Sequence, residues 1–318
     1  MPPPGEGMSL QRALELAAEA DGRAYPKPTI GAVVVADGRI VGEGATETDG
    51  RHGEVVALAA AGEQARGATL YVTMEPCTHQ GTTPPCVDAV LAAEIRRVVA
   101  GSLDPNPEAG GGLARLREQG VETELVDSFE ARRQNEAWRT WASLGRPFVT
   151  YKAAATLDGR VTVPGERWVS GEESRRLVHE LRAASDAVAV GMGTVRLENP
   201  RLDARDVDAP RQPRRLAFGT GPLPDGSELE LRSATLEDEL RALAGEGVQS
   251  LLLEGGPTLA RAFLEAGLVD KLALFVAPRL SGDGPLVVSG LEQPLRLTHL
   301  TSRQVGEDVL LEAYVREP

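Results

Sequence analysis

The sequence predicts an α/β protein built from two consecutive domains. Its 318 residues exceed the length of one average domain. Short apolar segments typical of strands alternate with segments typical of helices along the chain, which is the pattern of layered α/β domains. One helical segment, over 127–144, is broken by the sequence GRP at 145–147, and a new strand begins directly afterwards. We therefore place the first domain at 1–145 and the second at 146–318.

Composition narrows the class of protein. The chain is 42% hydrophobic and 25% charged, the balance of an ordinary globular protein. Its formal net charge of −13 argues against a nucleic acid as a general partner, because phosphate binding requires basic surface. No apolar stretch approaches the roughly 18–20 residues of a membrane span, and the opening MPPPGEGMSL lacks the layout of a secretory signal. We expect a cytoplasmic protein with no membrane partner.

Strands and helices follow one another at short intervals in the first half. A hairpin is expected at 29–46, because Asp37 and Gly38 form a turn signal between two apolar runs. In the helix at 127–144, Trp138 and Trp141 are expected to pack in a core or between domains. The other expected elements are helices at 54–64, 86–95 and 112–120, and strands at 69–77, 96–102 and 121–126.

A histidine and two cysteines stand at boundaries between these elements. His52 opens a helix two residues before Glu54. Cys77 ends a strand, and Cys86 opens the next helix, whose N-terminus favours a thiolate. One imidazole and two thiolates suit a zinc ion and leave a fourth position for water. Glu54 is then placed to move protons between that water and a leaving amine.

Simpler interpretations of these residues exist. A lone histidine is more often a surface or core residue than a ligand, and His-x-Glu is common by chance. The order His-x-Glu, Pro-Cys and a second Cys, however, is the signature of zinc-dependent nucleobase deaminases. A non-catalytic, zinc-stabilised nucleotide-binding module is a further alternative. Glu54 argues against it, because a structural site has no use for a carboxylate beside an open metal position.

The flanking sequence resembles one particular family. EPCTHQGTTPPC at 75–86 resembles the motif of the riboflavin-biosynthesis deaminase, the N-terminal half of the bifunctional RibD family. The resemblance extends to YPKPTIGAVVV, GATLYVTMEPC and the loop DPNP at 104–107. It implies a cytidine-deaminase-like three-layer α/β/α domain that hydrolytically deaminates a diaminopyrimidinone ribosyl phosphate. It also implies a homo-oligomer.

Five positions near the expected metal differ from the family pattern. Lys27 replaces an asparagine, Thr46 and Val56 replace histidines, Gly53 replaces an alanine, and Thr82 replaces a lysine or arginine. None of these changes removes a zinc ligand or the proton-transferring glutamate. They fall among positions expected to contact the substrate. The deamination chemistry is therefore better supported than the identity of the pyrimidine, and a modified pyrimidine is an alternative substrate. We expect Lys27 to bind substrate.

The second half again alternates strands with helices. Ser170 and Glu173 form a capping box that predicts a helix start. A buried strand is expected at 186–195, and a strand, a glycine turn and a helix at 248–267. Backbone N–H groups at such a turn suit a phosphate or pyrophosphate.

Several segments in this half resemble the RibD reductase, whose fold is similar to that of dihydrofolate reductase. They are FVTYKAAATLDGRV, WVSGEESRR, VHELRAASDAVAVGMGTV, ENPRLDAR and EGGPTLARAFLEAGLVDKL. The resemblance implies an NADPH-dependent reduction of the ribosyl group to a ribityl chain. It assigns cofactor contacts to Ala154, Trp168, Thr194, Glu198, Gly256, Pro257, Thr258, Leu259, Ala260, Arg261 and Ala262. It assigns substrate contacts to Lys152, Arg182, Leu202, Arg205 and Glu254, where the two arginines suit a phosphate by the guanidinium fork.

Three departures concern the reductase half. Glu198 stands where the family has an aspartate, and Asp203 replaces a threonine beside the expected phosphate site. The chain is also shorter than usual between Arg215 and Val248, a region that in the family helps to hold the adenosine side of the cofactor. We therefore expect the reductase to be the weaker activity. A deaminase with a degenerate, structural reductase domain is the alternative.

Overall fold

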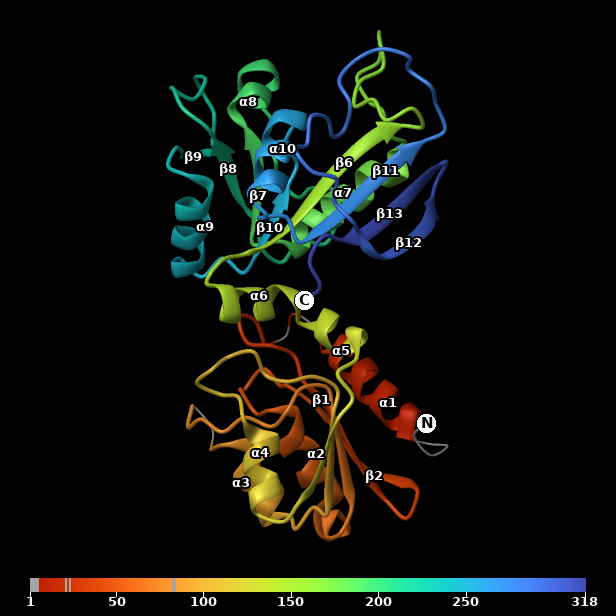
Figure 1. Ribbon diagram of the computed structural model, residues 1–318, viewed down its shortest axis with the longest axis vertical. Coiled ribbons are helices and arrows are strands. Elements are labelled where there is room, and N and C mark those ends of the chain that lie inside the picture. Colours follow the sequence, from red (N-terminus) through yellow and green to blue (C-terminus); the bar gives the residue numbers. More distant parts are fainter. Residues whose placement is uncertain (1–5, 21, 23, 82–83) are drawn as a thin grey trace. The chain divides into compact units, whose positions relative to one another are not determined.

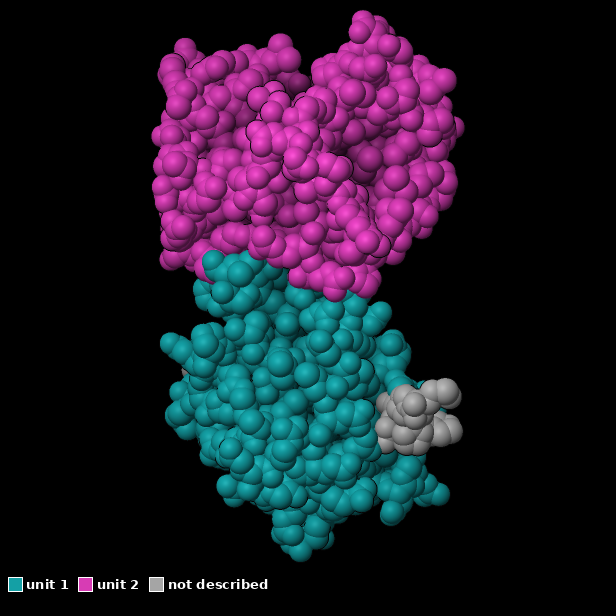
Figure 2. All heavy atoms as spheres, in the orientation of Figure 1, with its two compact units in different colours: residues 1–144, 318 teal, residues 145–317 magenta. Residues whose placement is uncertain are grey.

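The computed structural model describes residues 6–20, 22, 24–81 and 84–318. The chain divides into two compact units, one of residues Met1–Leu144 with Pro318 and the other of Gly145–Glu317 (Figure 2). Each unit has its own sheet and its own apolar core. Within the described residues, no helix combines the length and the apolar character needed to cross a membrane.

The sheet of the first unit has the strand order β2-β1-β3-β4-β5. β1 pairs antiparallel with β2 and β3, whereas β3, β4 and β5 run parallel. Asp37 and Gly38 both have positive φ, 49° and 73°, as a tight hairpin turn requires, so the expected hairpin is confirmed. The strands are β1 Gly31–Ala36, β2 Arg39–Ala45, β3 Thr69–Val72, β4 Arg97–Ala100 and β5 Glu122–Leu125.

Helices cover both faces of this sheet because its strands are apolar on both sides. Ala32 and Val34 of β1 join a core with α2, α3 and α4. Val33, between them, points the other way and packs with Leu10 and Ala13 of α1, a helix that we did not expect from the sequence. The expected three-layer α/β/α arrangement is confirmed. The helices are α1 Glu6–Glu19, α2 Gly53–Ala61 with the 3₁₀ turn Gly62–Ala65, α3 Cys86–Ala92 and α4 Gly112–Glu118.

The single helix expected at 127–144 is wrong. The structure has two helices, α5 Phe129–Gln134 and α6 Glu136–Leu144, separated at Asn135. The side chain of Asn135 accepts a hydrogen bond from the backbone N–H of Thr29 (2.9 Å) and donates one to its carbonyl (3.0 Å). The backbone of Asn135 leaves the helical region, with φ of −119° and ψ of 33°, while its side chain is tied to a distant segment.

The sheet of the second unit has the order β12-β13-β11-β6-β10-β7-β8-β9 (Figure 1). The strands from β11 to β9 in this order are parallel, and β13 and β12 add an antiparallel edge. The expected reductase-like α/β fold is confirmed. The strands are β6 Phe148–Thr156, β7 Ala187–Gly191, β8 Arg214–Phe218, β9 Glu230–Arg232, β10 Ser250–Leu253, β11 Lys271–Ala277, β12 Thr298–Val305 and β13 Asp308–Tyr314.

Helices again pack on both faces. On one face, Leu240 and Leu243 of α9 and Phe263 of α10 share a core with alternate residues of the parallel strands. On the other face, α8 packs through Val195 and α7 through Val178. The helices are α7 Glu172–Ala184, α8 Met192–Glu198, α9 Leu236–Gly245 and α10 Pro257–Glu265.

Two local expectations in this unit are wrong. Helix α7 is capped at Gly171, and no capping box forms from Ser170. Asp308 of β13 performs that task instead, because its Oδ2 accepts hydrogen bonds from the Gly171 N–H (2.8 Å) and the Ser174 hydroxyl (2.6 Å). The strand expected at 186–195 ends at Gly191, and the next residues begin α8.

Candidate active sites

His52, Cys77 and Cys86 come together at one edge of the first sheet. His52 is the N-cap of α2, Cys77 follows β3, and Cys86 is the first residue of α3. His52 Nδ1 lies 3.1 Å from Cys86 Sγ and 3.6 Å from Cys77 Sγ. All three possible ligand atoms lie within 4.8 Å of one another. One imidazole and two thiols at this spacing fit a zinc ion with one further position open to substrate.

The two thiols are not equivalent. A hydrogen bond from the Cys86 thiol lowers the pKa of Cys77 to about 4, while the same interaction and burial raise the pKa of Cys86. The backbone N–H of Cys86 also points to Cys77 Sγ at 3.4 Å. This N–H, at the start of α3, helps to hold Cys77 as a thiolate, and Cys86 itself stands at the same helix N-terminus, as expected from the sequence.

Close backbone packing leaves no room for the family's alanine between His52 and Glu54. A Cβ at Gly53 would lie 2.3 Å from the carbonyl oxygen of Ile30, closer than side chains can approach a backbone atom. The helix thus begins in direct backbone contact with the residue before β1. The change from alanine belongs to packing and does not alter the pocket.

Glu54 is buried beside the cluster. It is 2% exposed, and its Oε2 is among the buried polar atoms without a hydrogen-bond partner. Burial raises the pKa of Glu54 to about 7. A buried carboxylate oxygen without a partner is costly, and a water or substrate amine at the metal position would satisfy it. This orphaned oxygen supports a metal centre with an open position over a structural zinc site.

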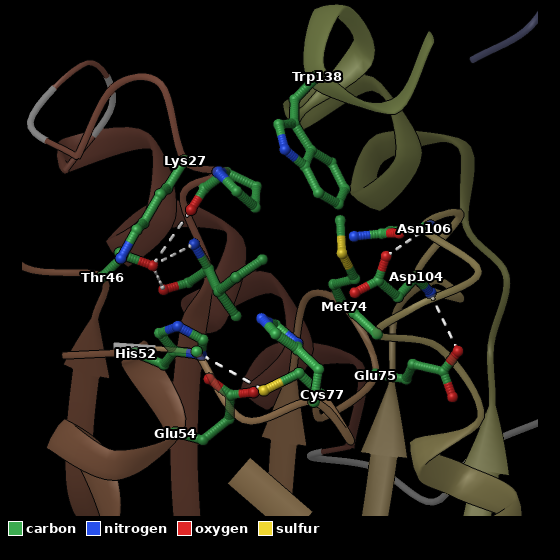
Figure 3. A pocket seen from close by; sticks show the side chains of 15 residues that line it. Lys27, Thr46, His52, Glu54, Met74, Glu75, Cys77, Asp104, Asn106 and Trp138 are labelled. Carbon is green, nitrogen blue, oxygen red and sulfur yellow. Dashed lines mark hydrogen bonds between the residues drawn. The ribbon is translucent and has the colours of Figure 1, made fainter. Parts of the chain in front are cut away.

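A cavity of about 260 Å³ opens above the cluster (Figure 3). Its lining comes from five parts of the first unit, namely 27–30, Thr46, 52–54, 74–109 and α6. Among the described lining residues, Lys27 is the one lysine or arginine. The lining residues are Lys27, Pro28, Ile30, Thr46, His52, Glu54, Met74, Glu75, Cys77, His79, Gly81, Asp104, Asn106, Ala109 and Trp138.

Thr46 and Val56 also differ from the family pattern, and the structure places them in different surroundings. Thr46 lines the cavity, but its hydroxyl already accepts a hydrogen bond from the Ile30 N–H at 2.9 Å. Val56 does not line this cavity, and its Cβ faces Gly44 in the packing of α2 on β2. Thr82 lies outside the described residues.

Sequence reasoning missed several lining residues. Asp104 and Asn106 belong to the DPNP loop, which matched the family pattern and was the signal available for them. Burial raises the pKa of Asp104 to about 6. Glu75 holds the loop, because its carboxylate accepts hydrogen bonds from the N–H groups of Asp104 and Leu113, both at 3.1 Å. Trp138 was expected in packing alone, yet it both packs on the core and lines the cavity.

In the second unit, the Glu254 carboxylate forms ion pairs with two cationic side chains. Lys152 of β6 approaches its Oε2 at 2.9 Å, and Arg182 of α7 reaches it with Nε (2.5 Å to Oε1) and Nη2 (3.0 Å to Oε2). Burial alone would raise the pKa of Glu254, but Lys152 and Arg182 lower it to about 2. The guanidinium fork of Arg182 therefore holds Glu254. The expected contact between Arg182 and a substrate phosphate stays a prediction, and in this structure a carboxylate occupies the fork.

The remaining expected substrate residues lie on the loop after α8. Arg205 is half-exposed and pairs with Asp203, which also pairs with Arg201 at 2.8 Å. Leu202 is 3% exposed and packs in the core, with φ of 54°. An apolar side chain buried in a core cannot reach a ligand, so only the backbone of Leu202 remains for the expected contact.

The strand, glycine turn and helix expected at 248–267 are confirmed as β10, the turn at Gly256 and α10. Gly256 caps α10 with no side-chain hydrogen bond to the first turn, and Pro257 occupies the start of the helix. A Cβ at Gly256 would lie 3.8 Å from Thr194 Oγ1, so the first turns of α8 and α10 are neighbours. Thr258 is exposed, and Leu259 packs against Gly255. Free backbone N–H groups at such a helix start suit an anion.

The other expected cofactor residues are more scattered. Ala260 is fully buried under the sheet, so its side chain cannot meet a ligand, whereas Ala262 is exposed. Arg261 pairs with Glu265 at 2.9 Å. Glu198 is the exposed last residue of α8, and Ala154 packs against a core of the second unit.

Trp168 is half-exposed and lies near two cations. The guanidinium carbons of Arg167 and Arg175 lie 5.0 Å and 5.5 Å from its ring centroid. Such contacts are cation–π interactions. Trp168 is thus a surface aromatic and not part of a core.

Both halves match known families. Residues 8–102 match the zinc-binding region of cytidine and deoxycytidylate deaminases, and residues 147–311 match the RibD C-terminal domain. The riboflavin biosynthesis protein RibD of Aquifex aeolicus is 37% identical over 95% of this chain and 96% of its own length. RibD of Mycobacterium tuberculosis H37Rv is 41% identical over 98% and 97%.

Solved structures agree. Acinetobacter baumannii RibD superposes with a TM-score of 0.83 at 32% identity, covering 96% of this chain and 98% of that one. The deaminase/reductase of Thermotoga maritima superposes with a TM-score of 0.80 at 33% identity, covering 96% and 97%.

Replacing Cys86 by serine should abolish most zinc binding. The wild type should contain about one zinc per chain, because three protein ligands are available, and the variant loses one thiolate. Elemental analysis of purified protein measures this. Glu54→Gln is the control and should retain zinc, since Glu54 is not a ligand. Full zinc content in Cys86→Ser would contradict the ligand assignment.

Replacing Glu254 by glutamine should destabilise the second unit by about 3–5 kcal/mol at pH 7, because it leaves two cations without their buried partner. The pKa of Glu254 is lowered in the folded protein, so its ionised form stabilises the fold above about pH 4.5. That contribution is lost as the pH falls from about 4.5 toward 2, where wild type and variant should converge. Urea unfolding at several pH values measures the difference. A gap that is unchanged in acid would contradict it.

Proposed function

Because the chain belongs to the RibD family, we propose that the cluster of His52, Cys77 and Cys86 holds its zinc ion and that Glu54 moves the protons of deamination. The chain is a bifunctional enzyme of riboflavin biosynthesis, a zinc-dependent pyrimidine deaminase joined to an NADPH-dependent reductase. The alternative of a deaminase with a merely structural reductase domain is not favoured, since the RibD C-terminal match runs across residues 147–311.

The observation that carries the proposal is the orphaned oxygen of Glu54. A bound zinc ion supplies Lewis-acid activation of water. Deamination adds one water to the amino-bearing carbon and releases one ammonia, so the water must lose a proton and the departing amine must gain one. Glu54 is buried, with Oε2 unpartnered beside the cluster, and a carboxylate in that place can accept the proton from the water and donate it to the departing amine.

The walls of the cavity support a polar, glycosylated pyrimidine as substrate. Asp104 and Asn106 offer acceptors and an amide on one side, and Lys27 stands on the other (Figure 3). We assign the diaminopyrimidinone ribosyl phosphate to this cavity, with the reacting carbon at the Glu54 end. Incubation of the protein with that compound, with and without NADPH, followed by mass analysis, tests both steps. Absence of the deaminated product would overturn the assignment.

For the reductase half, we propose that the substrate lies beside the Lys152–Glu254–Arg182 network and that the cofactor phosphates lie at the Gly256 turn. NADPH, when bound, supplies the reducing equivalents. The free N–H groups at the start of α10 support a phosphate there. Lys152, held by Glu254 at 2.9 Å, keeps an ordered cation at the end of the parallel strands, where α/β sheets bind ligands.

We place the enzyme in the cytoplasm, where its phosphorylated substrate and NADPH are found, and expect a homo-oligomer. Light scattering of the purified protein tests the second point, and a monomer at micromolar concentration would contradict it.

Glu54→Gln should lower ammonia release by at least ~10²-fold, the usual scale of general acid–base catalysis. The amide keeps the size of the side chain but cannot cycle a proton. Zinc content and thermal unfolding should stay near wild type. Ammonia release near the wild-type rate would show that another group moves the protons.

Lys27→Ala should lower kcat/KM for the phosphorylated substrate by roughly 10–150-fold, the range that a charge-assisted hydrogen bond of about 1.5–3 kcal/mol corresponds to. The reason is that Lys27 is the one lysine or arginine among the described lining residues, so alanine removes the cation that would contact the phosphate. The dephosphorylated nucleoside should be affected little, and Lys27→Arg should keep most of the activity. Equal effects on both substrates, or none on either, would contradict a phosphate contact.

A further inference from the structure

Trp138 is the aromatic wall of the deaminase cavity. Among the described lining residues it is the one phenylalanine, tyrosine or tryptophan. Figure 3 shows its indole pointing from α6 into the cavity, on the side away from Glu54 and Cys77. The proton-transfer mechanism does not use it, and the chain contains two other tryptophans at which the same measurements can be controlled.

The helix that carries Trp138 is anchored on both sides of this residue. Asn135, three residues earlier, is 8% exposed and makes two hydrogen bonds to the backbone of Thr29. Arg139, the next residue, donates to the carbonyl of Leu103 at 2.7 Å. Both anchors are bonds to backbone atoms, so they specify the position of α6 without depending on the rotamer of a partner side chain.

Each anchor reaches one rim of the cavity. Thr29 lies between the lining residues Pro28 and Ile30, and Leu103 precedes the lining residue Asp104. Helix α6 is thus tied to two rims that are far apart in the sequence. Trp138 also packs against the apolar core of the unit, which limits the rotation of its ring. A large aromatic side chain held this firmly is a preorganised surface for a flat ligand.

We propose that Trp138 is a substrate-contacting residue whose indole packs against the heterocycle of the pyrimidine and sets its position relative to Glu54. This inference rests on the proposed function, because it takes the pyrimidine as the occupant of the cavity. Aromatic side chains pack on heterocyclic bases through their flat faces, which tolerates varied substituents on the ring edge. The polar groups of Asp104 and Asn106 are left to recognise the edge or the sugar.

Steady-state ammonia release from Trp138→Ala, Trp138→Phe and Trp141→Ala tests the proposal. Stacking on a base is worth about 1–3 kcal/mol by alanine substitution, so Trp138→Ala should lower kcat/KM by roughly 5–150-fold, mostly through KM. Trp138→Phe should recover much of the loss. Trp141→Ala changes the same helix outside the described lining and should leave kcat/KM unchanged.

A second substrate separates the heterocycle from the sugar. The diaminopyrimidinone base without its ribosyl phosphate should lose the same factor in Trp138→Ala as the full substrate. A loss confined to the full substrate would overturn the contact with the heterocycle. An unchanged kcat/KM in Trp138→Ala, or an equal loss in Trp141→Ala, would overturn the proposal altogether.

Fluorescence covers the case in which Trp138→Ala fails to fold. The double variant Trp141→Phe/Trp168→Phe keeps Trp138 as its one tryptophan. Saturating addition of the base should change its emission, and no change at a concentration that inhibits ammonia release would overturn the proposal. A wild type that releases no ammonia would instead contradict the proposed function, so the two failures are distinguishable.

Discussion

The deaminase site depends on how closely helix α2 packs against the β1–β2 hairpin. A Cβ at Gly42 would lie 2.3 Å from the carbonyl oxygen of Ala57, and one at Gly44 would lie 2.5 Å from its nitrogen. A Cβ at Gly53 would meet the carbonyl oxygen of Ile30 at 2.3 Å. Three glycines thus allow backbone to touch backbone along this helix. Because the helix starts against the sheet, His52 and Glu54 at its start lie at the same edge as Cys77, which follows β3.

The same edge brings together the other parts of the pocket. The segment 27–30 precedes β1, and the loop with Asp104 follows β4, whose neighbour β3 ends before Cys77. Helix α6 then closes this edge by bonding to both segments through Asn135 and Arg139. The positions of His52 and Glu54 therefore depend on the packing of α2, whereas the aromatic wall depends on the two anchors of α6.

The second unit organises its site with charge rather than with close backbone contact. Glu254 ends a parallel strand and is surrounded by Lys152 and Arg182 from neighbouring elements. A buried carboxylate between two cations is stable only if both stay in place. The nearby turn at Gly256 adds backbone N–H groups beside Thr194. Both units thus use the ends of parallel strands and the starts of helices, where polar groups are free to meet a ligand.

The sequence by itself determined the two α/β halves, the hairpin at Asp37 and Gly38, and the grouping of His52, Cys77 and Cys86 as candidate metal ligands with Glu54. These features depend on local spacing and on residues whose chemistry is specific, so no long-range contact was needed to find them. The glycine turn at Gly256 could also be predicted from the sequence, because the strand, the turn and the helix are consecutive in the chain.

Only the tertiary structure decided the rest. Asn135 divides a helical sequence, and its side chain makes two hydrogen bonds to the backbone of Thr29, more than a hundred residues away. The fork of Arg182 holds Glu254, which lies 72 residues further along the chain. From the sequence alone, Trp138 is indistinguishable from an aromatic residue of the core, and only the position of α6 shows that it lines the cavity. In each case the partner comes from a distant segment, and a side chain's bonding depends on which partner the fold brings nearest.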